Sequence, residues 1–170
     1  MKKVNNNRNT NSMMKKKSID TAKDPYLNKN EPADGSHCKK CGAVFQDKRW
    51  TLSDEARSKA APSGGAVLCP ACQKIKEGYA EGFVTLSGGF LADHKEEIIN
   101  LVKNKEERAM YVNPLSRIID IRESDGNVEI RTTTAKLAQR IGQILEKAYK
   151  GTVDYKWSDD VKIARVAWSR

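Results

Sequence analysis

The sequence lacks the features of a membrane-spanning or secreted protein. No apolar run reaches the roughly 18 residues that a membrane-spanning helix requires. The N-terminus is basic, but it has neither the apolar core nor the small-residue cleavage site of a secretion signal. These absences predict a cytoplasmic protein that has no membrane partner.

The sequence also has little of what an active site needs. It contains 2 histidines, which is few for acid–base catalysis. Ser87-Gly88-Gly89 is rich in glycine but lacks the Lys and the Ser or Thr of a phosphate-binding P-loop. The acidic pairs at 96–97 and 106–107 have lysines around them, which is typical of a solvated helix face. We therefore expect neither enzymatic activity nor a small-molecule substrate.

Positive charge is abundant. The 170 residues are 38% hydrophobic, which suffices for one compact domain or two small ones with a tail. The 31 Lys and Arg exceed the 22 Asp and Glu, so the formal net charge is +9. Most of the excess lies in residues 1–30, which contain eight basic residues and two acidic ones. This balance favours a polyanionic partner such as nucleic acid, although a basic tail can also serve solubility alone.

The chain divides into three predicted parts. Residues 1–36 are rich in Asn, Lys and Ser and poor in large apolar residues, so we expect a disordered basic tail. Residues 37–90 contain four cysteines, many glycines and short apolar runs such as 83–86, which is typical of a metal-stapled module with short strands. Within this module, residues 52–61 are expected to form a short exposed helix or a loop. Residues 91–170 have the patterns of an α+β domain.

That domain is expected to begin with a helix. Asp93 is a candidate N-cap with Glu96 three residues later, and apolar residues then recur at helical spacing until about Arg108. Residues 117–123 and 128–132 alternate as the two strands of a hairpin around turn residues 124–127.

A second helix and a second hairpin follow. Thr133 or Thr134 can cap the helix, whose apolar stripe ends near Gly151. Residues 153–157 and 162–168 form the hairpin, with its turn at 158–160. The predicted fold class is therefore α+β, with a zinc-ribbon-like module followed by a small antiparallel sheet in the order α-β-β-α-β-β. The helices should cover one face of this sheet and can leave the other face open.

The cysteines form two C-x-x-C pairs, Cys38 with Cys41 and Cys69 with Cys72. In a reducing compartment such pairs indicate metal ligands rather than disulfides. Gly42 after the first pair and Pro70 inside the second suit the tight turns that bring two sulfurs to one side of a metal. The spacer 42–68 is long but compatible with an insertion between two such turns. We expect the four cysteines to bind Zn²⁺.

Other interpretations of the cysteines fit less well. A redox-active C-x-x-C pair needs a βαβ setting, which the sequence lacks. His37 precedes the first pair and His94 is distant in sequence; either can in principle replace a cysteine, but four cysteines make this unnecessary. A site filled by four thiolates leaves no open position for water, so we expect structural zinc that supplies much of the module's folding free energy.

Three groups of residues are candidates for contact with RNA. In and just after the first cysteine pair these are Lys39, Lys40, Lys48, Arg49 and Trp50. The cations can meet phosphates, and Trp50 can either stack on a base or pack under the zinc module. The polar side of the second helix adds Lys136, Arg140, Lys147 and Lys150, which can also be an ordinary solvated face. The tail adds Lys15, Lys16 and Lys17.

Two resemblances to known families bear on these residues. The segments 69–72 (Cys-Pro-Ala-Cys), 82–90 (Gly-Phe-Val-Thr-Leu-Ser-Gly-Gly-Phe) and 94–101 resemble a family of small bacterial proteins with paired C-x-x-C motifs. The segments 130–141 (Ile-Arg-Thr-Thr-Thr-Ala-Lys-Leu-Ala-Gln-Arg-Ile), 148–151 and 155–157 are similar to part of the nonsense-mediated decay protein three family, whose members bind the large ribosomal subunit. The zinc cysteines of that family would correspond to the four cysteines of this chain. The family has more C-x-x-C pairs and further domains, so the resemblance implies contact with ribosomal RNA and not the nuclear export function.

These features together predict a non-enzymatic zinc-binding protein that binds RNA and associates with the large ribosomal subunit. Two other classes fit the same residues. One is a DNA-binding or transcription-associated zinc ribbon, which retention on duplex DNA would distinguish. The other is a protein–protein adaptor, whose partners would survive nuclease and high salt.

Overall fold

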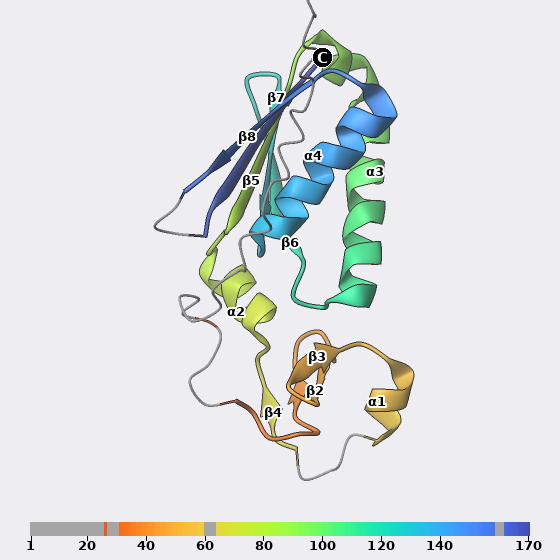
Figure 1. The fold of residues 1–170 in the computed structure, drawn as a ribbon, viewed down its shortest axis with the longest axis vertical. Helices are drawn as coiled ribbons and strands as arrows, with labels where there is room; N and C mark the ends of the chain where they lie inside the picture. The colour runs from red at the N-terminus through yellow and green to blue at the C-terminus, as the bar shows by residue number, and fades with distance from the viewer. Residues whose placement is uncertain (1–25, 27–30, 60–63, 159–161) are drawn as a thin grey trace, which may run out of the picture.

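The computed structural model describes Tyr26 and residues 31–59, 64–158 and 162–170. These residues form two parts, a small sheet at the cysteine turns and a larger sheet with two helices packed on it (Figure 1). We call them the metal-binding module (the described residues within 35–77) and the α+β layer (the described residues within 82–170). Most of the predicted disordered tail, including Lys15, Lys16 and Lys17, lies outside the described residues.

The described residues that precede the first strand contact folded parts of the chain. Gly35 donates a backbone hydrogen bond to the Phe45 carbonyl, and the Phe45 N–H donates one to the Ser36 carbonyl, both at 2.8 Å. The Tyr26 ring lies with its centroid 5.0 Å from that of Tyr79. The folded metal-binding module therefore begins before the first cysteine pair.

The small sheet is made of very short strands in the order β3-β2-β1-β4. They are β1 (His37–Cys38), β2 (Val44–Gln46), β3 (Arg49–Thr51) and β4 (Ala66–Val67). β1 pairs antiparallel with β2 and parallel with β4, so the segments that lead into the two cysteine pairs lie side by side. The helix α1 (Asp54–Lys59) follows β3, inside the range 52–61 where we expected a helix or loop. Its first turn is capped by Ser53, whose Oγ accepts a hydrogen bond from the Ala56 N–H at 3.1 Å.

The larger sheet has five strands in the order β6-β7-β5-β9-β8. The strands are β5 (Gly82–Ser87), β6 (Ile118–Ser124), β7 (Asn127–Thr132), β8 (Thr152–Trp157) and β9 (Ala164–Ser169). The helices are α3 (Gly89–Val112), between β5 and β6, and α4 (Ala135–Tyr149), between β7 and β8. A chain that combines these helices with two mixed sheets belongs to the α+β fold class.

Two features of the larger sheet differ from the sequence-based expectation. The pattern predicts 83–86 as a strand of the metal-binding module, whereas β5 lies at the centre of the larger sheet, where Val84 and Leu86 are fully buried. The predicted sheet is antiparallel, whereas β5 pairs parallel with β9 and antiparallel with β7. A parallel pair needs a long connection, and here α3, both hairpin strands, α4 and β8 separate the two strands in sequence. Local patterns do not report such a distant pairing.

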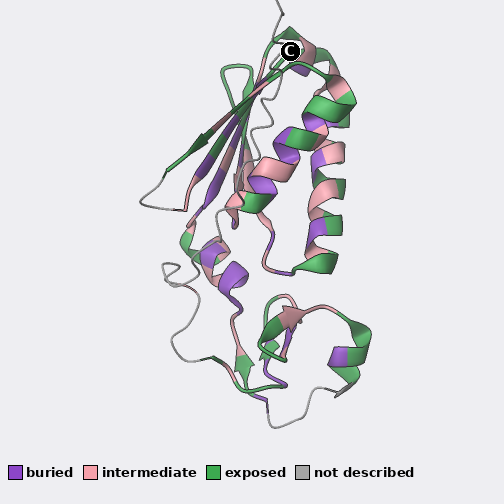
Figure 2. Ribbon diagram, viewed as in Figure 1, coloured by how far each residue is buried: buried purple, intermediate pink, exposed green. Residues whose placement is uncertain are grey.

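Both long helices cover the same face of the larger sheet (Figure 1). Their inner faces and the sheet share a buried apolar core, seen as the buried residues that line the layer in Figure 2. Fully burying one of its large apolar side chains contributes about 2 kcal/mol to folding. Gly142 allows α4 to approach β9 closely, because a Cβ at this position would lie 2.6 Å from Cγ1 of Val166. Apolar packing therefore holds this layer together.

The helix α3 is longer than the predicted helix. It begins at Gly89 rather than after Asp93 and ends at Val112 rather than near Arg108. It is kinked at His94, whose φ of −120° and ψ of 17° are not helical. The His94 ring stacks on that of Phe90, with centroids 4.1 Å apart. The turn before the kink is thus held by an aromatic contact that helical periodicity does not reveal.

The two predicted hairpins are present. β6 pairs with β7 through a turn at Asp125 and Gly126, whose φ values of 52° and 76° are those of a tight hairpin turn. β8 pairs with β9, and most of the turn expected at 158–160 lies outside the described residues. Thr134 is the N-cap of α4, and its hydroxyl accepts a hydrogen bond from the Leu137 N–H at 3.3 Å.

The helix α2 (Pro70–Glu77) connects the two parts of the molecule (Figure 1). Its Lys74 is buried, and the Lys74 ammonium lies 2.6 Å from the Glu81 carboxylate, which is also buried. The same ammonium donates to the Thr133 carbonyl at 3.4 Å, next to the start of α4. The Glu81 backbone N–H in turn donates to the Thr132 carbonyl at 3.0 Å, so the buried ion pair links α2 to the α+β layer through Glu81.

Candidate metal centre and adjoining cleft

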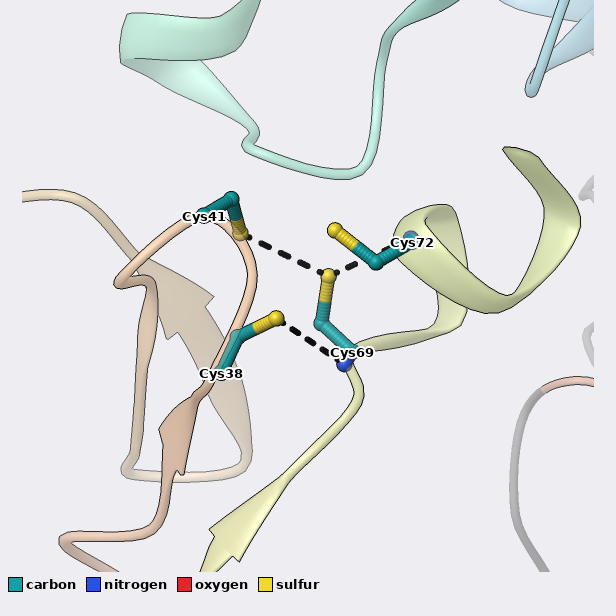
Figure 3. A group of neighbouring side chains, drawn as sticks. All are labelled: Cys38, Cys41, Cys69 and Cys72. Carbon is teal, nitrogen blue, oxygen red and sulfur yellow. Dashed lines mark hydrogen bonds between the residues drawn. The ribbon is translucent and has the colours of Figure 1, made fainter. Parts of the chain in front are cut away.

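The four cysteines of the two C-x-x-C pairs meet at one point (Figure 3). Cys38 ends β1, and Cys41 lies in the turn that follows. Cys69 is the N-cap of α2, and Cys72 lies in the first turn of that helix. The four Sγ atoms all lie within 4.8 Å of one another, so this group can hold a metal ion. The spacing of the cysteines in the sequence predicts this meeting, and the structure shows it.

The first pair is carried by a tight turn. The Cys38 N–H donates to the Ala43 carbonyl at 2.7 Å, and the Gly42 N–H donates to the Cys38 carbonyl at 2.8 Å. Gly42 has a φ of 71°, a left-handed conformation that glycine adopts without a steric cost. The turn therefore points both sulfurs toward the second pair.

The second pair uses the start of a helix. Pro70 occupies the first helical position, where its fixed φ and missing N–H suit the turn. The Cys72 N–H donates to the Cys69 sulfur at 3.5 Å, and the Cys69 N–H donates to the Cys38 sulfur at 3.4 Å. Backbone N–H groups at a helix N-terminus stabilise negative charge on sulfur. The backbone thus favours thiolates in both halves of the site.

Four thiols this close cannot ionise independently. A hydrogen bond with Cys69 lowers the pKa of the Cys41 thiol to about 4. The same contact, together with burial, raises the pKa of the Cys69 thiol. Burial raises the pKa of the Cys72 thiol to about 11. At neutral pH these shifts favour a thiolate at Cys41 and thiols at Cys69 and Cys72, and a bound cation would favour thiolates at these positions as well.

The separation of one sulfur pair matches that in a tetrahedral metal site. Zn–S bonds of about 2.3 Å in a tetrahedron place neighbouring sulfurs about 3.8 Å apart. The Sγ atoms of Cys41 and Cys69 are 3.7 Å apart. Neither His37 nor His94 belongs to the group, so no histidine is needed to complete four ligands.

Apolar side chains from both parts of the molecule cover the cysteines. Trp50, Leu52 and Leu68 of the metal-binding module pack against the buried cluster, and so does Leu115, from the segment between α3 and β6. Three of the cysteines are buried and Cys41 is partly exposed. The site is therefore enclosed partly by the α+β layer, and not by its own module alone.

A cleft of about 320 Å³ adjoins this cover. Its walls include Lys48, Arg49 and Trp50 on one side and Val112 and Leu115 on the other. Trp50 packs against the cysteine cluster, which is one of the two roles that the sequence left open, and it also lines the cleft. Its ring meets that of Phe45 at a centroid distance of 5.4 Å.

The other residues predicted to contact RNA lie elsewhere. Lys39 and Lys40 are exposed between the first two cysteines. The helix set is on α4 and its C-terminal cap: Lys136, Lys147 and Lys150 are exposed, and Arg140 is partly buried. None of these residues lines the cleft, so the structure groups only Lys48, Arg49 and Trp50 there.

The far wall of the cleft was not predicted from the sequence. Val112 is 78% exposed and the adjacent Tyr111 is 85% exposed, at the end of α3. Exposed large apolar residues beside a cleft are typical of a contact surface. The pair Asn113-Pro114 that follows marks a helix end, but nothing local indicates which module faces it.

Comparisons with models of protein families, with curated proteins and with solved structures find no match. Among the described residues, no helix is long and apolar enough to cross a membrane. The function is therefore inferred from the metal centre, the cleft and the charge of the chain.

Proposed function

We propose that this chain is a non-enzymatic zinc-binding protein that binds RNA at the cleft beside its metal centre. We further propose that the RNA belongs to the large ribosomal subunit, the partner that the resemblance of segments 130–141, 148–151 and 155–157 implies. The supporting observation is that Lys48, Arg49 and Trp50 line one cleft next to the four-cysteine site.

Zinc is the metal that the ligand chemistry favours. Four thiolates are soft ligands, and tetrahedral all-sulfur sites in proteins hold zinc or iron–sulfur centres. Four protein ligands also leave no position for a reacting water, so the proposed zinc is structural. Its role is to fix the hairpin β2–β3 that carries the cleft residues.

The hairpin presents its cations in a fixed way. Asp47 and Lys48 form its turn with φ values of 50° and 61°. Non-glycine residues adopt such left-handed conformations at a cost of about 1–2 kcal/mol each, so the strain must be offset by the surrounding fold. The result is that exposed Lys48 and Arg49 stand beside the partly buried Trp50. In such an arrangement the cations can contact a phosphate, and the aromatic ring can stack on an unstacked base.

Charge supports RNA over an acidic small molecule. The chain has a net charge of +9, and a cleft with two cations and one acidic residue, Glu31, has an excess of positive charge. Neutralising phosphates releases counterions, so binding should weaken as the salt concentration rises.

A binding titration with matched variants tests the cleft. We expect the zinc-loaded full chain to bind structured RNA more tightly than duplex DNA at the same salt concentration. Lys48→Ala and Arg49→Ala should each weaken RNA binding several-fold and reduce the slope of log affinity against log salt by about 1. Lys103→Ala, on the exposed side of α3, removes the same charge outside the cleft and should change affinity little. Unchanged affinity in both cleft variants would contradict the proposed site.

The ribosomal part needs a separate measurement. In sucrose gradients of cell extracts at low salt, the chain should migrate with the large subunit and leave it at high salt. A chain that stays at the top of the gradient would rule out the ribosome, even if RNA binding in the titration is real. Partners that survive both nuclease and high salt would favour a protein–protein adaptor instead.

A further inference from the structure

The face of the larger sheet opposite α3 and α4 is a second surface of defined chemistry. Both helices pack on one side (Figure 1), and Val84, Ile130 and Val166 point to that side because they are buried in the core. Residues adjacent to them along each strand point to the other side. On that side Arg165 and Ala167 are exposed, and Phe83 is partly exposed.

Strand register places four of these side chains in one row. Lys156 of β8 is opposite Arg165 of β9, and Arg165 is opposite Phe83 of β5. Phe83 is in turn opposite Arg131 of β7. The row therefore reads Lys, Arg, Phe, Arg across four adjacent strands.

We propose that this row is a binding surface for single-stranded RNA, on which a base stacks against the Arg165–Phe83 pair. The proposal rests on the proposed RNA-binding function and adds a second contact surface to it. The guanidinium carbon of Arg165 lies 4.8 Å from the Phe83 ring centroid. A guanidinium plane stacked on an aromatic ring is itself a surface on which a base can stack.

The charges of the row are only partly neutralised within the protein. Arg131 forms an ion pair with Asp120, and Lys156 lies 3.4 Å from the exposed Asp154 carboxylate. In the part of the chain that the structure describes, Arg165 forms no ion pair, and its neighbour across the strand is another cation. Like charges directly opposite each other destabilise a sheet. A phosphate beside Arg165 and Lys156 would relieve this repulsion. On the other side of the sheet centre, β7 carries the acidic Glu129, so the excess of positive charge lies over β8 and β9.

The neighbouring row leaves room for an unstacked base. There Thr85 of β5 is opposite Ala167 of β9, and both are small and exposed. A flat surface with one planar stacking pair and small neighbours fits a splayed base better than a duplex, whose bases are stacked inside it. An acidic peptide would use the cations but not the stacking pair. This difference selects single-stranded RNA as the occupant.

The test uses the full zinc-loaded chain and three substitutions in the stacking pair. Phe83→Leu keeps an apolar side chain but removes the ring, Arg165→Lys keeps the charge but removes the plane, and Arg165→Ala removes both. We expect each to weaken binding of a short single-stranded RNA about tenfold. Binding of an RNA hairpin should change much less, and zinc content and circular dichroism should match those of the unmodified chain. Lys103→Ala serves again as the charge control.

The outcomes separate this proposal from the proposed function. If the unmodified chain binds RNA and the three variants bind single-stranded RNA equally well, the sheet surface is overturned and the cleft stands. If Arg165→Lys binds like the unmodified chain while Arg165→Ala does not, the site is electrostatic and the stacking proposal is wrong. If the variants lose affinity for a polyglutamate peptide as strongly as for RNA, the surface binds acidic protein segments instead. If the unmodified chain binds no RNA, the proposed function itself fails.

Discussion

The metal-binding module and the α+β layer differ in what fills their interiors. In the layer, apolar side chains from β5, β7, β9 and both long helices form a continuous buried cluster. In the module, the corresponding cluster consists of three cysteines and two alanines. Few large apolar side chains add to it: Trp50, Leu52 and Leu68 of the module pack against this cluster but are only partly buried, and Val44 and Phe45 are buried nearby. The layer is thus stabilised by apolar burial, and we expect the module to depend on a metal bound by its four cysteines.

Loss of the metal should affect the stability of the two parts most differently. Cys69→Ser, or chelation, should unfold the module, because zinc binding to small structural sites has an apparent free energy of about 10–16 kcal/mol. The layer should remain folded. Hydrogen exchange read by mass spectrometry checks this: amides in β1–β4 should lose protection, while those in β5, β7 and β9 should keep it. Ala66→Ser, on exposed β4, adds a hydroxyl without touching a ligand and should leave both parts protected.

Two results of that experiment would count against the interpretation. A chain purified without chelators that contains no zinc would argue against the metal centre. Equal loss of protection in both parts would mean that they fold as one unit and that the layer also depends on the metal.

The reverse experiment weakens the layer and leaves the metal in place. Ile141 is fully buried in α4, so Ile141→Ala should lower the free energy of unfolding of the layer by about 3 kcal/mol. Urea unfolding followed by circular dichroism measures this change, and a colorimetric zinc assay should show unaltered metal content in the folded state. Gln143→Ala, at an exposed position of the same helix, should change stability by less than about 0.5 kcal/mol. Zinc release that shifts to lower urea together with the melting of the helices in Ile141→Ala would show that the module depends on the layer.

The buried ion pair between Lys74 and Glu81 lies where the two parts meet, and it bears on how independently they unfold. Lys74→Met leaves the buried Glu81 carboxylate without the ammonium 2.6 Å away, which should cost about 3 kcal/mol. Glu81→Gln should cost a similar amount, and the double variant should cost less than the sum of the two. Unfolding that separates into two transitions in Lys74→Met, one accompanied by zinc release, would show that this pair couples the parts. Additive losses in the double-mutant cycle would show that it does not.

The sequence predicts the parts of this molecule that local chemistry determines. The Cys-x-x-Cys spacing, the cap at Thr134 and the turn at Asp125 and Gly126 each depend on a few adjacent residues. The central place of β5 could not be predicted, because it depends on pairing with β9 from the far end of the chain. The same holds for the cleft, whose walls come from β3 and the end of α3. Contact of the lysines with RNA stays a prediction.

Acid should cause a smaller change in stability, and this change should be confined to the α+β layer. Arg131 donates two hydrogen bonds to Asp120 and holds the pKa of this carboxyl below its ordinary value of 3.8. Because the folded-state pKa is depressed, the pair stabilises the layer above pH 3.8 and loses this contribution as the pH falls through the lower folded-state value. Asp120→Asn should therefore cost about 2 kcal/mol at neutral pH and almost nothing at the acidic end of a series of urea unfolding curves. Asp93→Asn, on exposed α3, is the control, and a stability difference for Asp120→Asn that persists unchanged into acid would mean that the amide, and not the lost charge, is responsible.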